Sequence, residues 1–309
     1  MIEYPLVSIG IPVYNLEDYI LATLISVELQ TYPNIEVIIL DDFSKDNSLH
    51  IIKKWMGNVK LNVRLIVNEK NEGLTKTCNV LLENSNGKYF QKLDGDDIMH
   101  REKISRHVEL LENNDSNFAL VFSDVELIDE NGELKKEDYF TRIGCKIDLN
   151  NFNYIDLLNL NFLPNPTILI KTEIIKKSGG YNSDLMFEDW DLWLRLLENN
   201  YNFFYDKSKT AKYRIHKKSM MMDIKKRILI NNSNFMMFKK RLMTKSVSSK
   251  ETIIKKVKNC AIYSYVLKDV DSYSKLKYAL SLKFNLKISI YMLIVFFKMR
   301  IKKKLQAND

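Results

Sequence analysis

Short runs of branched apolar residues alternate with longer stretches of helical apolar spacing through the first hundred residues. A run of the first kind packs its side chains on both faces of a strand, whereas helical spacing places them on one face of a helix. We predict strands at residues 6–11, 35–40, 63–67 and 87–92. We predict helices at residues 16–30, 49–55 and 75–83. Strands that alternate with helices favour a mainly parallel sheet flanked by helices, an α/β fold.

The pattern changes in the second half of the chain. Residues 118–124 form another apolar run, and residues 162–170 predict a turn followed by a strand. Glu188 and Asp189 then open a helix whose inner face carries Leu192, Leu196 and Leu197. Further along, strand patterning stops, and we predict helices over about 224–243, 250–268 and 272–304. The chain therefore divides into an α/β domain over residues 1–219 and a helical region over residues 220–309.

Polar side chains follow the ends of four predicted strands. They lie at residues 12–14, 41–42, 71–73 and 94–97. Because ligands of such sheets bind at the carboxyl ends of the strands, we expect these four segments to converge on one rim and to form a binding site.

The acidic segment at residues 93–97 carries the strongest chemical signal. Asp94, Asp96 and Asp97 surround Gly95, and three carboxylates so close repel one another unless a cation lies among them. Hard ions such as Mg²⁺ and Mn²⁺ take carboxylate oxygens and keep other positions for water and phosphate. The glycine permits a close backbone approach to a phosphorylated ligand. An acidic turn on a solvated loop is the alternative, since short motifs match often by chance.

Six segments, taken in order, resemble the motifs of the family 2 inverting glycosyltransferases, which have the GT-A fold. The similarity covers roughly residues 5–219, and a dinucleotide-binding Gly-x-Gly-x-x-Gly is absent after the first strand, which argues against a dehydrogenase. The segments are Ile-Pro-Val-Tyr-Asn at 11–15, Leu-Asp-Asp-Phe-Ser at 40–44, Asn-Glu-Gly-Leu at 71–74, Leu-Asp-Gly-Asp-Asp at 93–97, Gly-Gly-Tyr at 179–181 and Glu-Asp-Trp-Asp-Leu-Trp at 188–193.

The resemblance implies a nucleotide-sugar site in about the first hundred residues and an acceptor site in residues 101–219. Tyr14 is expected to stack on the nucleobase, and Asp42 to accept the imide N–H of uracil. Asp94 is expected near the ribose or the uracil. The nucleotide-sugar-binding residues that we predict are Pro12, Tyr14, Glu17, Asp42, Gly73, Lys76, Asp94 and Gly95. Lys76 is equally well explained as a solvated lysine on a helix.

The same resemblance implies a metal ion, Mn²⁺ or Mg²⁺, on the diphosphate. Asp96 is the first candidate ligand, with Asp97 beside it and His216 from a segment similar to the family's Tyr-Arg-x-His-x-x-Ser motif. The ion would offset the negative charge of the leaving nucleotide. A histidine that follows an apolar strand is otherwise most often a structural residue.

Asp189 matches the family's general base, which takes the proton from the attacking hydroxyl. We assign Glu188 the task of holding the acceptor or orienting the base. A pair of carboxylates in a first helical turn is also what the helix dipole favours, so each residue has a purely structural explanation as well.

Charge divides the chain unevenly. Residues 216–309 hold 23 Lys and Arg against five Asp and Glu, whereas residues 1–215 hold 24 against 34. The overall net charge of +8 therefore combines an acidic domain with a basic tail. Nucleic acid also binds basic surfaces, but the tail has no recognisable reading motif, so we expect no nucleic-acid partner.

The last predicted helix contains an apolar run at residues 288–297, followed by Lys298, Arg300, Lys302, Lys303 and Lys304. Ten such residues are too few to cross a bilayer. They can lie in the interface of an anionic leaflet, where basic residues add attraction. Packing of this helix on the rest of the protein is the alternative.

Three widely spaced cysteines, Cys78, Cys145 and Cys260, form neither a metal-binding spacing nor a disulfide framework. Met1 runs directly into the first strand without a secretory signal. Both observations predict a cytoplasmic protein, and the basic tail with its apolar run predicts a peripheral location on the inner face of the plasma membrane.

Taken with the resemblance, these features predict a metal-dependent hexosyl- or N-acetylhexosaminyltransferase. It would move a sugar from a nucleotide diphosphate, with UDP favoured, to a hydroxyl on a lipid-linked glycan during bacterial capsule or lipopolysaccharide synthesis. A nucleotidyltransferase is one alternative, but it predicts a Gly-rich phosphate loop after the first strand, where residues 12–15 offer none. A non-catalytic scaffold that binds nucleotide or glycan is the other.

Overall fold

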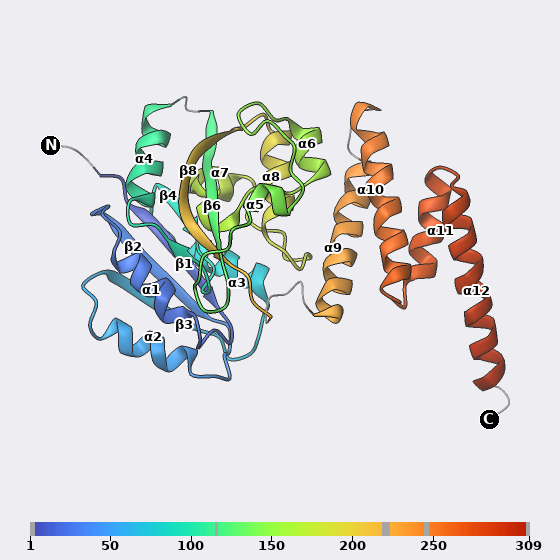
Figure 1. The fold of residues 1–309 in the computed structure, drawn as a ribbon, viewed down its shortest axis with the longest axis horizontal. Coiled ribbons are helices and arrows are strands. Elements are labelled where there is room, and N and C mark those ends of the chain that lie inside the picture. The colour runs from blue at the N-terminus through green and yellow to red at the C-terminus, as the bar shows by residue number, and fades with distance from the viewer. Residues whose placement is uncertain (1–3, 115–116, 218–222, 244–246, 307–309) are drawn as a thin grey trace. The chain divides into compact units, whose positions relative to one another are not determined.

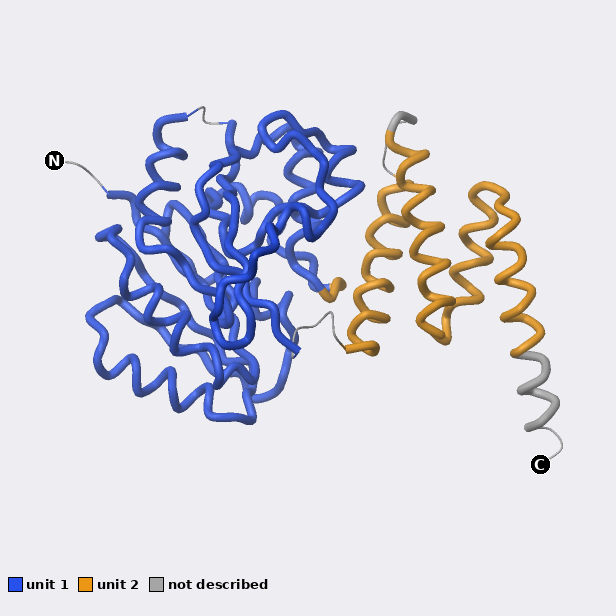
Figure 2. The backbone as a smooth tube through the Cα atoms, in the orientation of Figure 1, with its two compact units in different colours: residues 1–183, 187–217 blue, residues 184–186, 218–309 orange. Residues whose placement is uncertain are grey.

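The computed structural model describes residues 4–114, 117–217, 223–243 and 247–306. Side chains are described up to Lys298, apart from those of Val247 and Ser248. The chain forms two compact units (Figure 2), one of residues 1–183 and 187–217 and the other of residues 184–186 and 218–309. The predicted domain boundary at residue 219, with Ser219 of the histidine segment, falls outside the described residues.

Four parallel strands form the first half of unit 1, and helices connect them (Figure 1). Every residue of β1, β2 and β4 is buried, because helices cover both faces of the sheet, and this explains their continuous apolar runs. The edge strand β3 is only partly buried. These elements are β1 Val7–Val13, α1 Ile20–Glu28, β2 Ile35–Asp41, α2 Ser48–Met56, β3 Asn62–Val67, α3 Leu74–Glu83 and β4 Tyr89–Lys92.

The second half of unit 1 completes an eight-stranded sheet in the order β3-β2-β1-β4-β7-β6-β8-β5. Strands β6 and β8 are parallel, whereas β7 pairs antiparallel with both of its neighbours, as does β5 with β8. The elements are β5 Ile98–Met99, α4 Lys103–Asn113, β6 Phe118–Ile128, α5 Tyr139–Arg142, α6 Tyr154–Asn159, the short 3₁₀ helix η1 Asn165–Thr167, β7 Leu169–Lys171, α7 Thr172–Lys177, α8 Asp189–Glu198 and β8 Asn202–Arg214.

The strand register brings the predicted rim together. Val13 lies beside Asp41, and Asp41 beside Val67, so β1, β2 and β3 end at the same edge of the sheet. Lys92, the last residue of β4, pairs with Gly10, three residues before the end of β1. The polar segments that follow these strands therefore start from one side of the sheet.

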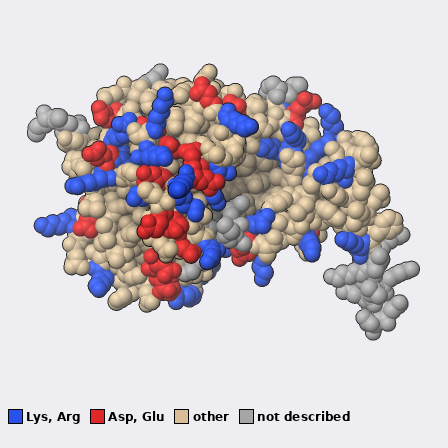
Figure 3. Space-filling model, in the orientation of Figure 1, with Lys and Arg blue, Asp and Glu red and all other residues tan. Residues whose placement is uncertain are grey.

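Unit 2 consists of helices α9 Ile224–Leu242, α10 Val247–Val266, α11 Ser272–Leu282 and α12 Leu286–Gln306. The carboxylate of Asp223 caps α9 by accepting from the N–H groups of Lys225 and Lys226. The visible face of this unit carries many Lys and Arg side chains and few Asp and Glu (Figure 3). Within the described residues, no helix is long and apolar enough to span a membrane.

The prediction of one helix over 272–304 is wrong. The chain becomes extended at Lys283, with φ −166° and ψ 130°, and α11 ends there. Asn285 then starts α12, because its side-chain oxygen accepts from the N–H of Ile288 at 3.1 Å. Asparagine side chains often bind nearby backbone groups in this way, which favours the start of a helix over its interior.

Candidate functional site

Asp42 organises the loop that follows β3. Its buried carboxylate accepts from the side-chain amide of Asn68 at 2.7 Å and from the N–H groups of Glu72 at 2.8 Å and Gly73 at 2.9 Å. Gly73 has φ +89°, a conformation that other L residues adopt only with strain, and it caps α3. A carboxylate has about four acceptor positions, so Asp42 keeps one for a ligand.

The residues after β1 divide into exposed and structural positions. Tyr14 is exposed, as a stacking residue requires, whereas Pro12 is a buried member of β1. Glu17 lies on the loop before α1 and accepts from both the backbone and the side-chain amide of Asn47, at 2.9 and 2.8 Å. Glu17 thus ties this loop to the start of α2, which explains its presence without a ligand.

Gly95 and Lys76 also have structural explanations. A Cβ at Gly95 would lie 2.9 Å from Cδ1 of Leu16 and 3.2 Å from Cδ1 of Ile20, so a larger side chain would have to push these two side chains aside. Lys76 lies on the exposed surface of α3 and pairs with Glu72 at 3.1 Å. The arrangement matches the solvated-lysine alternative for Lys76.

A buried lysine connects the acidic loop to α8. Nζ of Lys92 lies 2.6 Å from the carboxylate of Asp94 and 2.7 Å from that of Glu188. Glu188 also accepts from the side-chain amide of Asn165, in η1, at 2.7 Å. Burial alone would raise the pKa of Glu188, but the charge of Lys92 and these hydrogen bonds lower it below its usual value. Burial raises the pKa of Asp94 to about 6, although Lys92 opposes the rise.

Asp189, the first residue of α8, has a different environment from Glu188. Its carboxylate accepts from the side-chain amide of Asn161 at 2.8 Å and from the N–H of Trp190 at 2.6 Å. Burial and the neighbouring charge of Glu188 raise the pKa of Asp189 to about 6. Two adjacent carboxylates with pKa values pushed apart are typical of acid–base sites, and the one near neutrality suits a general base.

The chain also brings Asp96 and His216 together, although 120 residues separate them. Nε2 of His216 lies 2.9 Å from the carboxylate of Asp96, and the buried ring packs against Tyr19 with 4.8 Å between ring centroids. Arg214, the last residue of β8, fixes this approach because its Nε donates to the carbonyl of Asp96 at 2.9 Å.

Asp97 points elsewhere. One carboxylate oxygen accepts from the backbone N–H of Arg214 at 2.9 Å, and the other is buried without a hydrogen-bond partner in the part of the chain that the structure describes. Burial and the nearby charges of Asp96 and Asp94 raise the pKa of Asp97 well above its usual value. This geometry supports a role in joining the acidic loop to β8.

The side chains available as ligands fit a metal ion that is bound mainly by the phosphates of the substrate. Within the described residues, no group of three or more His, Cys, Asp or Glu side chains is arranged to hold an ion. Asp96 and His216 form a pair with oxygen and nitrogen 2.9 Å apart, and both atoms can contact one ion at bond lengths of about 2.1 Å. Mg²⁺ typically has one or two protein carboxylates and completes its shell with phosphates and water.

Sequence reasoning missed three parts of this site, namely Lys92, the two asparagines Asn161 and Asn165, and the bracing role of Arg214. One signal was available for Lys92, because a lysine that ends a wholly buried strand needs acidic partners. The asparagines carry no comparable signal, since their partners are known only once α8 is placed beside them.

Similarity to known proteins was found along most of the chain. Residues 8–177 match the model of "Glycosyl transferase family 2". An uncharacterized glycosyltransferase of Rickettsia prowazekii is 30% identical over 217 residues, which are 69% of this chain and 64% of the relative. The chain thus spans less than two thirds of that protein. An uncharacterized glycosyltransferase of Methanocaldococcus jannaschii is 30% identical over 215 residues, 69% of this chain and 72% of the relative.

Solved structures share the fold at low identity. S. aureus TarS 1–349 in complex with UDP-GlcNAc has a TM-score of 0.63 at 18% identity, over 93% of this chain and 78% of that one. The mannosyltransferase PcManGT from Pyrobaculum calidifontis, in complex with GDP-Man and Mn²⁺, has a TM-score of 0.63 at 16% identity, over 99% and 83%. These similarities confirm the predicted fold, a mixed, mostly parallel GT-A-like sheet with a C-terminal helical region. The family match over residues 8–177 and the relatives at 30% identity show that the chain belongs to glycosyltransferase family 2.

Proposed function

We propose that this glycosyltransferase moves a hexosyl or N-acetylhexosaminyl group from a UDP-sugar to a glycan hydroxyl with inversion at the sugar carbon. The observation that carries the proposal is the contrast between Glu188 and Asp189 at the start of α8. One carboxylate is held ionised by Lys92, and the pKa of the other is raised to about 6.

In the proposed reaction, Asp189 accepts the proton of the acceptor hydroxyl as that oxygen attacks the sugar. Asn161 donates to one oxygen of Asp189 and the N–H of Trp190 to the other, which fixes the orientation of the base. Glu188 lies one residue away and is already bonded to Lys92 and Asn165, so its task is to hold the acceptor or the base in place. The nucleotide leaves from the opposite face of the sugar, as inversion requires.

On the donor side, Asp42 and the loop it organises would bind the nucleobase, with the ring of Tyr14 stacked on it. Asp96 and His216 would hold Mn²⁺ or Mg²⁺, and Asp97 would join the acidic loop to β8 through its hydrogen bond with Arg214. When bound, the ion supplies Lewis-acid stabilisation of the departing diphosphate. The Mn²⁺ bound together with GDP-Man in the mannosyltransferase PcManGT supports this choice of metal.

The donor and the cellular setting belong to the same proposal. The UDP-GlcNAc complex of TarS favours a uridine nucleotide, whereas the GDP-Man complex of PcManGT indicates a competing donor. We propose a lipid-linked acceptor in surface-polysaccharide synthesis and a peripheral location on the inner face of the plasma membrane. The basic tail supports attraction to such a surface.

A donor screen tests the proposal. Purified protein with Mn²⁺ is given UDP-, GDP- and dTDP-sugars, and the release of nucleotide is measured with Asp189→Asn as the control. We expect release from UDP-sugars that depends on metal and on Asp189. Absence of release from every donor, together with nucleotide binding by calorimetry, would instead indicate a non-catalytic scaffold.

A further inference from the structure

Helix α12 is mostly apolar between residues 288 and 297, and one of its faces completes unit 2. Ile288 is fully buried, and Tyr291 stacks on Tyr265 of α10 with 4.5 Å between ring centroids and 18° between planes. Phe296 approaches Tyr273 of α11 at 6.2 Å. This inward face forms part of the unit's core.

The opposite face of α12 lacks such cover. Leu286, Ile290, Leu293 and Phe297 follow one another at intervals of four, three and four residues, which places them along one stripe of a helix. Each of these side chains is between 48 and 65% exposed. We call these four residues the outward face. Because an apolar stripe of this length is unfavourable in water, its presence indicates a surface that covers it.

The charge around the outward face identifies the covering surface. Residues 272–309 contain nine Lys and Arg against one Asp, and one of the nine, Lys275, is buried and pairs with Asp269. Two copies of the outward face would bring these like charges together, so a second copy of the chain is disfavoured. An anionic surface with an apolar interior complements both properties at once.

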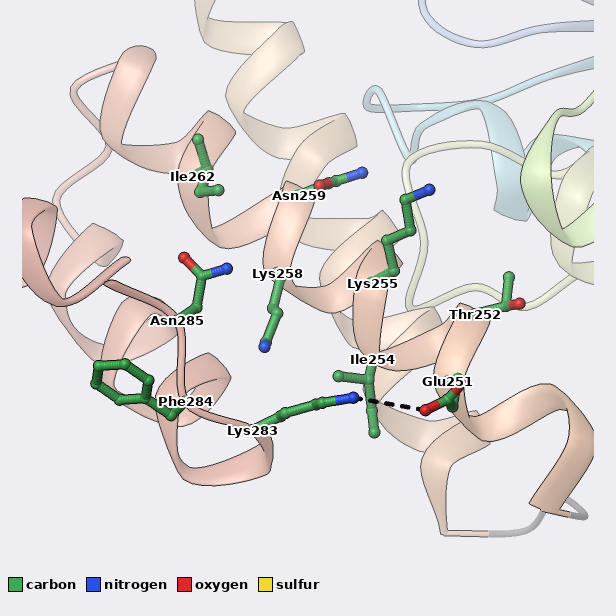
Figure 4. Close-up of a pocket in the computed structure, with 10 residues that line it drawn as sticks. All are labelled: Glu251, Thr252, Ile254, Lys255, Lys258, Asn259, Ile262, Lys283, Phe284 and Asn285. Atoms are coloured by element: carbon green, nitrogen blue, oxygen red, sulfur yellow. Dashed lines mark hydrogen bonds and ion pairs between the residues drawn. The ribbon is translucent and has the colours of Figure 1, made fainter. Parts of the chain in front are cut away.

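A lysine-lined hollow lies at the turn that leads into α12 (Figure 4). Its volume is about 540 Å³, and Lys255, Lys258 and Lys283 line it, with Glu251 as the acidic residue among the described side chains around it. Glu251 pairs with Lys283 at 3.5 Å, which leaves the other two lysines without compensation from within the hollow. Burial and the charge of Lys283 lower the pKa of Lys258, so an anion here would relieve repulsion. The exposed ring of Phe284 lies at the same turn.

We propose that the outward face of α12 inserts into the interface of an anionic phospholipid bilayer, with the lysines of the hollow on lipid phosphates. An interfacial helix buries its apolar face at the boundary of head groups and acyl chains, and basic neighbours add electrostatic attraction. The outward face extends along the helix axis, so its insertion would place α12 along the surface. Docking of this kind rests on the peripheral location proposed above and names the helix face that makes the contact, but it does not depend on sugar transfer.

The inward face of α12 decides which variants are informative. Deleting the helix would remove Ile288 and Tyr291 from the core, so loss of binding by a truncated chain would have two explanations. Substitutions confined to the outward face leave the core intact. We therefore choose Ile290→Ser with Leu293→Ser, and as a matched control Val266→Ser with Val270→Ser, which are exposed apolar residues of the same unit outside α12.

The experiment is co-sedimentation of the full chain with vesicles of phosphatidylcholine, with and without phosphatidylglycerol, over a range of salt. We expect binding to the anionic vesicles that weakens as salt rises. The outward-face variant should bind roughly tenfold more weakly, since two side chains no longer transfer from water, and the control variant should bind as the wild type does. Lys258→Gln with Lys283→Gln should weaken binding to anionic vesicles by roughly tenfold or more and reduce its dependence on salt.

Three results would overturn the proposal. Equal binding by the wild type and the outward-face variant would show that the outward face is not part of the contact with the vesicles. A lower melting temperature of that variant without vesicles would show that the stripe packs inside the protein. Loss of a dimer in sedimentation velocity would identify a second copy as the occupant. Nucleotide release in the absence of vesicles should be the same for all variants, so a failure of docking is distinguishable from a failure of the transferase proposal.

Discussion

At the scale of single residues, the site depends on how a few buried charges are divided among neighbours. Lys92 contacts two carboxylates, so the acidic loop and α8 share one cation. Removing one member of a buried ionic group usually destabilises a protein by about 3–5 kcal/mol, because the remaining charge lacks compensation. The chemistry proposed for Asp189 therefore depends also on Lys92, a buried residue to which we assign no contact with the sugar.

Asp189→Asn tests the base directly. Asparagine keeps the size of the side chain but accepts no proton, so turnover should fall by about 10²–10⁴-fold. The affinity for UDP should change little, because Asp189 contacts Asn161 and Trp190 rather than the predicted donor residues. Calorimetry that showed loss of UDP binding would move Asp189 to the donor site.

The pH dependence of the wild type follows from the same residue. Because the pKa of Asp189 is raised to about 6, the base is ionised above that pH and protonated below it. The value of kcat/KM should therefore decline as the pH falls through about 6.

In Lys92→Met the carboxylates lose their cation, so this decline should begin at higher pH, whereas Lys92→Arg should retain the wild-type profile. Lys88→Met, which removes an exposed lysine before the same strand, is the control. An unchanged profile in Lys92→Met would show that this lysine does not tune the base.

Asp96→Ala tests the metal pair. It removes the carboxylate beside His216, so Mn²⁺-dependent nucleotide release should fall by several orders of magnitude while the melting temperature changes little. Asp129→Ala, an acidic residue outside the pair, should keep its activity. If Asp96→Ala remained active in the presence of EDTA, the assignment of the metal would be wrong.

At the scale of elements, two glycines serve the site for different physical reasons. Gly95 is constrained by packing, since a Cβ there would displace the side chain of Leu16, whereas Gly73 has open space but a positive φ. The first constraint belongs to packing between a loop and its neighbours, and the second to the backbone itself.

Substituting each glycine by alanine should separate the two reasons. Gly95→Ala should destabilise the protein by about 1–3 kcal/mol through overpacking. Gly73→Ala should cost about 1–2 kcal/mol through strain. In a Leu16→Ala background the cost of Gly95→Ala should shrink, while that of Gly73→Ala should stay the same. Denaturant unfolding measures all of these costs, and equal coupling of Leu16 to both glycines would contradict the distinction.

Elements also explain what the sequence could predict. The fully buried strands β1, β2 and β4 produce continuous apolar runs, so their existence and their parallel direction could be predicted. The antiparallel insertion of β7 between β4 and β6 was not, because its three residues pair with partners distant in the chain. In the site, the approach of Asp42 and Gly73 could be predicted because both follow the carboxyl ends of neighbouring strands. The contact of Lys92 with Glu188 could not, because it spans 96 residues and leaves no local pattern in the sequence.

At the scale of the whole molecule, the chain combines an acidic α/β region with a basic helical one. The predicted apolar run at 288–297 proves to be two surfaces, one in the core of unit 2 and one exposed. Both explanations offered for it from sequence are therefore compatible, because packing occupies one side of α12 and leaves the other side free for a partner. The basic side chains at 300–304 lie outside the described ones.

The link through Lys92 has a consequence for recombining family members. A chimera that joined residues 1–100 of this chain to the acceptor half of another transferase would carry Lys92 and Asp94 but would exchange Glu188 and Asn165. If the incoming half lacked an acid at the place of Glu188 and an amide at that of Asn165, the chimera would contain the buried Lys92 with only one of its two carboxylates. An acid and an amide at these two places, rather than overall identity, are the criterion by which such parts should be chosen for swapping acceptor specificity.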